Sequence, residues 1–178
     1  RLRHTPWVNI LLIAANVIVF FGLQGMRSDT DAVREFLLRP EHPEVLHFFT
    51  SMFMHANIGH LLGNMLFLWV FGNAINDSFG HLGYLLFYLA GGIVAGIGYV
   101  LISGTAPVLG ASGAIAAVTG AFLVLFPRVR VTVLLPFYIY MPFEISSVVF
   151  IGLQFVWNVF APLVPSQGGG VAYVAHTS

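Results

Sequence analysis

The sequence predicts an all-α fold, a polytopic bundle of transmembrane helices in a single domain over residues 1–178. Of its 178 residues, 58% are hydrophobic and only 8% are charged, whereas a soluble domain carries about 25% charged residues. The mean hydropathy is +0.88. Several apolar segments approach the roughly 20 residues that a helix needs to cross a bilayer. Such segments must be helical, because lipid satisfies no backbone polar group.

Five apolar segments are long enough, or nearly so, to span the membrane, and a sixth begins near Val171. We therefore expect six transmembrane helices, with the sixth truncated at the C-terminus, at Ser178. The five complete segments cover about 6–24, 58–76, 82–102, 111–127 and 145–164.

The connections between these segments indicate the orientation. Residues 25–57 form a long loop with five of the seven acids, whereas 73–81 is a short polar loop and 128–144 is a mixed segment rich in aromatic residues and proline. Arg1 and Arg3 precede the first span, and a second arginine pair follows the fourth. Positive charge at span ends favours the cytoplasmic side, so the 25–57 loop is expected outside.

Composition excludes several classes of function. The chain has no cysteine, so disulfides, thiol catalysis and zinc–thiolate sites are excluded. It has no lysine, and seven basic residues balance seven acidic ones, so no basic patch indicates nucleic acid as a partner. No cofactor motif is expected. Aspartyl chemistry is disfavoured because no two aspartates lie in spans, and a channel or transporter would predict inverted repeats, which are not apparent.

The motif Gly110-Ala111-Ser112-Gly113 opens the fourth apolar segment. Serine in a membrane helix commonly serves packing, and this remains the alternative. The flanking glycines, Gly110 and Gly113, permit an unusual turn and a close approach of backbone. A helix N-terminus presents unpaired N–H groups and positive potential. Ser112 would therefore have beside it a site suited to a tetrahedral oxyanion.

Two polar residues, His60 and Asn64, share one face of the second span because they are four positions apart. They form either a hydrogen-bonded pair between helices or donors to a developing oxyanion. A histidine within a span is functional by default. His55 lies off that face and is expected to brace the loop. A metal site of His55, His60 and His176 is a weaker alternative, because no carboxylate lies nearby to orient the ligands.

His176 is the only histidine downstream of Ser112. A serine hydroxyl needs a base to take its proton before it can attack. If the fourth and sixth spans touch, His176 is the available base. No carboxylate is near it in the sequence, so a Ser-His dyad is expected rather than a full triad.

These motifs together resemble the rhomboid family of intramembrane serine proteases, of the bacterial type with a six-span core. The resemblance rests on His60-x-x-x-Asn64, Gly110-Ala111-Ser112-Gly113 and Ala175-His176, in the family's order and on its second, fourth and sixth spans. It implies a single rhomboid-like membrane domain over 1–178 and a protease that cleaves transmembrane segments of other proteins. A supporting motif, Phe49 to His55, lies in the first loop.

By this resemblance, Ser112 is the nucleophile and His176 the general base. His60, Asn64 and the backbone N–H of Ser112 form the oxyanion hole, and the supporting residues are Gly110, Gly113 and His55. The resemblance implies no cofactor and no metal. The implied partners are transmembrane substrates and the lipid bilayer, and the implied location is a bacterial plasma membrane with the active site open to the outside.

The chain departs from the family pattern at two places. Leu46-His47 stands where the family often has Trp-Arg, which affects the anchoring of the first loop. Ala116 stands where a tyrosine often packs on the catalytic histidine. The alternative function is a non-catalytic rhomboid-like protein that binds membrane clients, but the chain keeps both Ser112 and His176, which favours an active enzyme.

Overall fold

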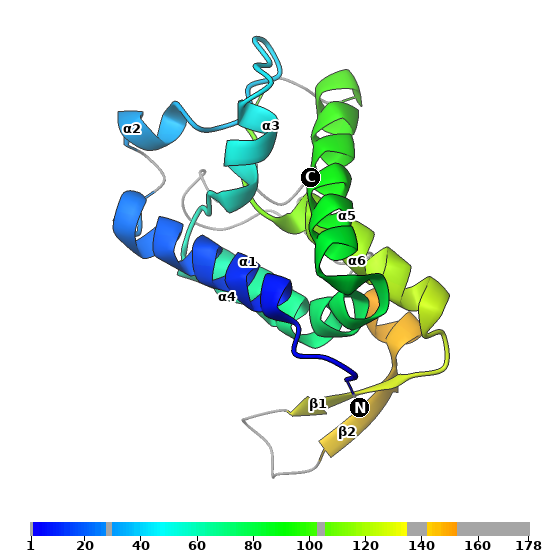
Figure 1. Cartoon of the computed structure of the whole chain (residues 1–178). Coiled ribbons are helices and arrows are strands. Elements are labelled where there is room, and N and C mark those ends of the chain that lie inside the picture. Colours follow the sequence, from blue (N-terminus) through cyan, green and yellow to red (C-terminus); the bar gives the residue numbers. More distant parts are fainter. Residues whose placement is uncertain (1, 28–29, 103–105, 135–141, 153–178) are drawn as a thin grey trace, which may run out of the picture.

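The computed structural model describes residues 2–27, 30–102, 106–134 and 142–152, and this part of the chain is mostly helical (Figure 1). Residues 147–152 are also helical. The elements are α1 (Trp7–Ile18) with a π-helical turn (Val19–Leu23), α2 (Asp31–Arg34), α3 (His47–Thr50) with a 3-10 turn (Ser51–Phe53), α4 (Ile58–Phe67) with a π-helical turn (Leu68–Gly72), α5 (Asn73–Ile102), α6 (Ser112–Leu125), β1 (Arg130–Leu134) and β2 (Pro142–Ser146).

Within the described residues, one helical run, Ile58–Ile102, is long and apolar enough to cross a membrane. Two shorter apolar helices cover Trp7–Leu23 and Ser112–Leu125. The expected count of six spans is therefore not established by the structure. Most of the fifth expected span, beyond residue 152, and all of the sixth lie outside the described residues.

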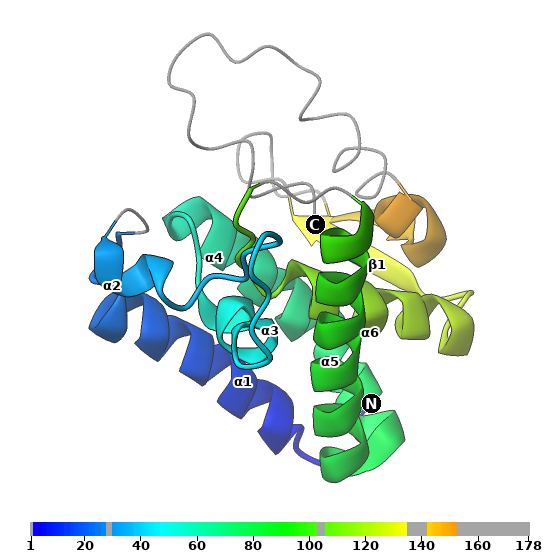
Figure 2. The ribbon, with the colours of Figure 1, turned by 90° about the horizontal axis from the view of Figure 1, so that it is seen from above.

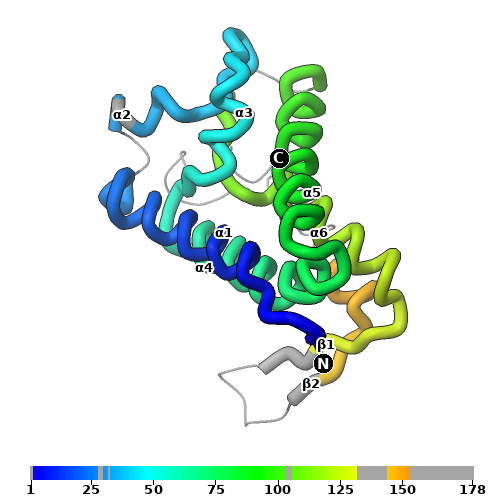
Figure 3. The backbone as a smooth tube through the Cα atoms, in the orientation of Figure 1, coloured from blue at the N-terminus to red at the C-terminus, as the bar shows by residue number. Residues whose placement is uncertain are grey.

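The prediction of a polar loop at 73–81 is wrong, because the chain stays helical there apart from Gly80. That glycine has φ 72° and ψ 170°, a conformation open to glycine but not to other residues. The helical run reverses at this point, and the tube in Figure 3 follows the backbone through the reversal. Polar side chains stabilise the helix before Gly80: Asn73 Nδ2 donates to Trp69 O at 2.8 Å, and Ser78 Oγ donates to Ala74 O at 2.8 Å.

The mostly helical character is confirmed, but the fold is not purely α-helical, because β1 and β2 form an antiparallel hairpin with Arg130 opposite Ser146. The run from Val131 to Val133 is β-branched, which favours a strand over a helix. An ion pair between Arg130 Nη1 and Glu144 Oε2, 3.5 Å apart, joins the strands. Figure 1 draws the hairpin at the same end of the molecule as the N-terminal segment and opposite α2 and α3. The two arginine-bearing segments therefore share one end of the molecule, as the orientation argument requires.

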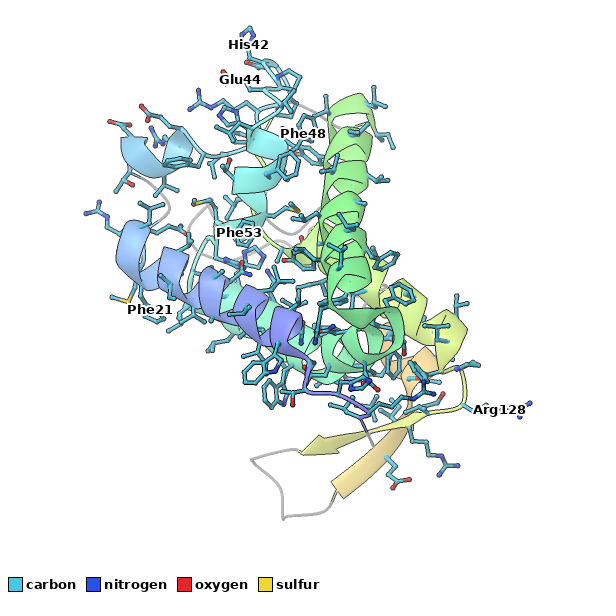
Figure 4. The ribbon with its side chains drawn as sticks, viewed as in Figure 1. Phe21, His42, Glu44, Phe48, Phe53 and Arg128 are labelled. Atoms are coloured by element: carbon cyan, nitrogen blue, oxygen red, sulfur yellow. The ribbon has the colours of Figure 1, made fainter. Side chains whose placement is uncertain are left out.

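Small residues let α5 and α6 pack closely. A Cβ on Gly91 would lie 2.5 Å from Ala117 Cβ, and a Cβ on Gly113 would lie 2.5 Å from Ala95 Cβ. Helix α5 also packs closely against the first loop, because a Cβ on Gly96 would lie 2.9 Å from Phe48 Cδ1. Figure 4 shows Phe48 between α3 and α5, which are neighbours in both Figure 1 and Figure 2. The small residues of the fourth span thus serve α5 in the described part of the fold.

Candidate functional site

The motif around Ser112 lies at the start of α6. Ser112 is the first residue of that helix, Ala111 is its N-cap, and Ile115 N donates to Ala111 O at 2.9 Å. Gly110 precedes them with φ 121°, in the region that favours glycine. The first N–H groups of an α-helix have no acceptor within the helix and carry its positive dipole end. The serine hydroxyl is therefore placed where a negative charge is stabilised.

His60 and Asn64 extend from α4 to the same point. A Cβ built on Gly110 would lie 2.8 Å from His60 Cε1, 3.0 Å from His60 Nε2 and 3.8 Å from Asn64 Nδ2. The absence of a side chain at Gly110 is what allows this approach. Both polar side chains are buried. The prediction that they share one helix face is confirmed, and the structure brings that face against the motif that contains Ser112.

The amide of Asn64 is one of several buried polar side chains with an atom that lacks a partner among the described residues, and it is the one that lies against Gly110. Its Nδ2 atom is buried and has no hydrogen-bond partner within the described part of the chain. A buried donor without an acceptor costs about 1–3 kcal/mol, and such a group in a native structure calls for an explanation. Here the donor lies beside a helix N-terminus and a serine, so an oxygen atom carrying negative charge would satisfy it.

His55 lies behind His60. Their ring centroids are 5.2 Å apart with 63° between the planes, and the edge of Phe20 is on the other side. The backbone of His55 is held by Gln24, whose side chain accepts from His55 N and donates to His55 O, each at 2.9 Å. Burial, together with the nearby His60, lowers the pKa of His55 to about 4. His55 is therefore neutral at neutral pH, and it braces both the loop, as expected, and His60.

The remaining side of the site is formed by the first loop and α5. Gly110 N donates to Ser51 O at 2.8 Å, which fixes the turn before α6. A cavity of about 20 Å³ lies beside it, with Ser51, Met52, Gly110 and Gly113 in its lining. That volume holds about one water molecule. This small pocket lies between the first loop and α5, beside the turn that precedes Ser112, and its lining also includes the larger side chains of Leu38 and Phe48.

Two residues that position the site were missed from the sequence. Ser51 acts through its backbone carbonyl, which no side-chain pattern reveals. Asn57 is the N-cap of α4, and its side chain accepts from His60 N. An asparagine directly before an apolar helical run is a recognisable N-cap signal, so this residue could have been found.

The expected base, His176, lies outside the described residues, so the structure does not place it relative to Ser112. The suggested metal site of three histidines includes His176 and is untested for the same reason. Within the described ranges, no three His, Cys, Asp or Glu side chains come together as metal ligands.

Comparison with known proteins gives a consistent picture. A family model described as "Rhomboid domain" matches residues 42–178. The chain is 34% identical over 124 residues to the rhomboid protease GluP of Bacillus subtilis (strain 168), in a match that covers 66% of this chain and 24% of that protein. It is 30% identical over 128 residues to the presenilin-associated rhomboid-like protein, mitochondrial, of Homo sapiens, covering 69% of this chain and 34% of that protein.

A third relative is the rhomboid-like protein 11, chloroplastic, of Arabidopsis thaliana, 33% identical over 97 residues, with 54% of this chain and 32% of that protein covered. The matches thus span only about a quarter to a third of the length of these three relatives. Their names place them in a bacterium, a chloroplast and a mitochondrion, so they do not single out the bacterial plasma membrane that was expected.

Proposed function

The chain belongs to the rhomboid family of membrane proteins, and from this premise we propose that it is an intramembrane serine endopeptidase that cleaves transmembrane segments of other proteins. A relative named as a protease, GluP, supports an enzyme. Other relatives are named only as rhomboid-like. The choice between catalysis and client binding therefore rests on the site.

One observation carries the proposal. The buried Nδ2 of Asn64, which has no hydrogen-bond partner among the described residues, lies with His60 against Gly110, two residues before the serine that begins α6. An interhelical packing pair, the alternative interpretation, would satisfy its own donors. Donors held ready around a helix N-terminus instead suit the oxyanion of an acyl-transfer intermediate, where such preorganisation is most effective.

The proposed reaction uses Ser112 Oγ as the nucleophile. His176 takes the hydroxyl proton as Oγ attacks the scissile carbonyl carbon, and the carbonyl oxygen becomes an oxyanion that accepts hydrogen bonds from His60, Asn64 and the Ser112 N–H. The intermediate collapses to an acyl-enzyme, and His176 protonates the departing amine. Water then attacks the ester, with His176 as its base, and releases the second product.

The site is proposed to lie below the outer membrane surface. The 14 residues of α6 span about 21 Å at about 1.5 Å per residue, less than the roughly 30 Å of the hydrocarbon core. Arg128, which points away from the helices in Figure 4, follows its lower end and favours the cytoplasmic interface. Ser112 then sits at the floor of a recess, so a substrate helix must unwind to reach it, which favours segments with glycine or proline.

Two measurements on the purified protein test the proposal. A fluorophosphonate probe is expected to label Ser112, and a panel of single-span substrates is expected to be cut, less efficiently once their glycines and prolines are replaced by leucine. Labelling that persists in Ser112→Ala would overturn the assignment. Binding of single-span proteins without labelling or cleavage would establish the client-binding alternative.

We further propose that residues 1–178 form one rhomboid-like membrane domain of six spans, with the long first loop outside. Reporter fusions after Arg130 and within residues 30–44 should report opposite sides of the membrane. The membrane itself stays a prediction: the bacterial plasma membrane is the one suggested by the sequence, and fractionation of the source cells decides it.

A further inference from the structure

We propose that Asn57 is a positioning residue that acts through His60 and orients its imidazole so that Nε2–H is directed to the oxyanion site at Gly110. The inference rests on the proposed function for its catalytic consequence. Its structural part, the state of the His60 ring, stands on hydrogen bonds and close contacts alone.

The first step is the cap that Asn57 provides. Its backbone is extended, with φ −159° and ψ 174°, and its Oδ1 accepts from His60 N at 2.9 Å. This is the bond between an N-cap side chain and the third residue of the helix. A Cβ on Gly59 would lie 3.2 Å from Asn57 Oδ1, so the absence of a side chain at Gly59 leaves space for the capping oxygen. The backbone of His60 is thereby fixed at the first turn of α4.

The second step is the tautomer of His60. The backbone N–H of Ala56, one residue before Asn57, donates to His60 Nδ1 at 3.4 Å. A backbone N–H can only donate, so Nδ1 must be the acceptor. In a neutral imidazole one nitrogen accepts and the other carries the proton. The proton of His60 is therefore on Nε2.

The third step is the direction of Nε2. That atom would be 3.0 Å from a Cβ on Gly110, so it faces the turn that leads into Ser112. The other face of the ring is bounded by His55, whose ring centroid is 5.2 Å away. Rotating the ring by half a turn would put a carbon in place of Nδ1, which cannot accept from Ala56 N, and would exchange the positions of Nε2 and Cε1 beside Gly110. The Asn57 cap, the tautomer of His60 and the direction of its Nε2 atom are thus linked features of one structure.

The catalytic consequence follows from when the Nε2–H donor is used. A donor to an oxyanion interacts more strongly in the transition state than in the ground state, so its loss lowers kcat with little change in KM. Complete loss of such a donor lowers kcat by about 10²–10³-fold. Loosening it by removing the cap should lower kcat by about 10-fold.

The main test is Asn57→Gly. Glycine is itself a tolerated N-cap that costs only a few tenths of a kcal/mol, so the helix survives while the side-chain acceptor is lost. We expect kcat to fall about 10-fold with KM unchanged, and Asn57→Asp, which keeps the acceptor, to restore it. In a His60→Ala background Asn57→Gly should have no further effect. A full additional loss there would show that Asn57 acts by another route and overturn the proposal.

A matched control is available in the first loop. The Thr30 side chain caps α2 by accepting from Val33 N at 3.3 Å, and Thr30→Gly removes a cap in the same way but away from α4. It should leave kcat unchanged. An equal loss of kcat in both variants would show a general effect of loop stability and would contradict a specific role for Asn57.

A measurement independent of activity separates this inference from the proposed function. Nitrogen and carbon NMR shifts of labelled histidine distinguish the two tautomers, and a His60→Gln variant assigns the signal. The full chain should show His60 with the proton on Nε2, and Asn57→Gly should populate the second tautomer or broaden the signal. If the protein cuts nothing but these shifts appear, the positioning role stands and the protease proposal fails. A proton on Nδ1 in the wild type, or a signal that Asn57→Gly leaves unchanged, overturns the inference.

Discussion

Two polar clusters lie between the apolar helices of this protein, and they differ in how their hydrogen bonds are used. One joins α1 to the π-helical turn after α4 and to α5, near the end that carries the N-terminus. The other joins α4 to the start of α6. In the first cluster the hydrogen bonds of the central side chain are all formed, whereas in the second a buried donor is left without an acceptor among the described residues; we call them the complete and the incomplete cluster.

The first cluster is centred on Asn9, which is fully buried. Asn9 Nδ2 donates to Leu68 O and to Asn73 Oδ1, each at 2.8 Å, and Asn9 N donates to Asn76 Oδ1 at 3.1 Å. Tyr84 donates its hydroxyl to Asn9 Oδ1 at 2.6 Å. The π-helical turn that contains Leu68 leaves its carbonyl available to a side chain. Each polar atom of the Asn9 side chain is thus used within the protein.

The second cluster leaves the buried Nδ2 of Asn64 without a partner among the described residues. A polar network in an apolar interior is stabilising when it is satisfied and costly when it is not. Asparagine thus has a structural role at Asn9, whereas at Asn64 we propose that it binds the oxyanion. Polarity within a span does not by itself indicate function; at Asn64 the indication is a buried donor without a partner among the described residues, placed beside the N-terminus of α6.

The largest expected effect is a loss of cleavage activity on substitution of the proposed catalytic pair in the second, incomplete cluster. Ser112→Ala and His176→Ala should each lower cleavage by about 10⁴-fold or more, and the double variant should lose no more than either one, because the two act as a unit. Steady-state cleavage of a single-span substrate measures this. Substantial turnover by Ser112→Ala would place the chemistry elsewhere and remove the contrast between the clusters.

The next effect separates the two asparagines directly. Asn64→Ala removes an unused donor and should lower kcat by about 10²–10³-fold without loss of stability. Cleavage kinetics and thermal unfolding in detergent measure the two quantities on the same preparation. Unchanged activity with lowered stability would make Asn64 a packing residue, like its counterpart at Asn9.

Asn9→Ala is the converse test. It leaves Tyr84 and the carbonyl of Leu68 without partners in the interior, and at about 1–3 kcal/mol for each unsatisfied group the free energy of unfolding should fall by about 2–6 kcal/mol. The kcat of the folded fraction should not change. A specific loss of kcat with full stability would mean that the complete cluster also takes part in catalysis.

The sequence predicted the candidate site better than the fold around it. Motif spacing was enough to place Ser112 at a helix start and to put His60 and Asn64 on one face, because helical periodicity fixes those relations locally. The continuous helix through 73–79 depends on contacts between distant residues, such as Asn9 with Asn76, which local composition does not reveal. The hairpin could have been anticipated from three successive β-branched residues in β1, but the apolar character of the whole chain favoured helices.

The last prediction concerns His55, whose effect is confined to acidic pH, and it tests whether the histidine behind His60 is held neutral. The pKa of His55 is about 4 in the folded protein, below the ordinary value of about 6.5 in the unfolded chain. Between these two pH values the unfolded chain binds a proton that the folded protein does not. Stability from this group is therefore complete above pH about 6.5 and is lost as the pH falls toward about 4, with a slope of about 1.4 kcal/mol per pH unit.

Substitution of His55 by a residue that does not titrate isolates that slope. His55→Gln should flatten the dependence of unfolding free energy on pH between about 4 and 6.5, measured by unfolding in mixed detergent. His42→Gln is the control, because His42 is an exposed histidine of the same loop and appears at its outer edge in Figure 4. An unchanged slope in His55→Gln would mean that a positive charge is tolerated beside His60. A ring that tolerated that charge would be open to solvent, which contradicts a dry oxyanion site, so this pH dependence tests the burial on which the effects on kcat depend.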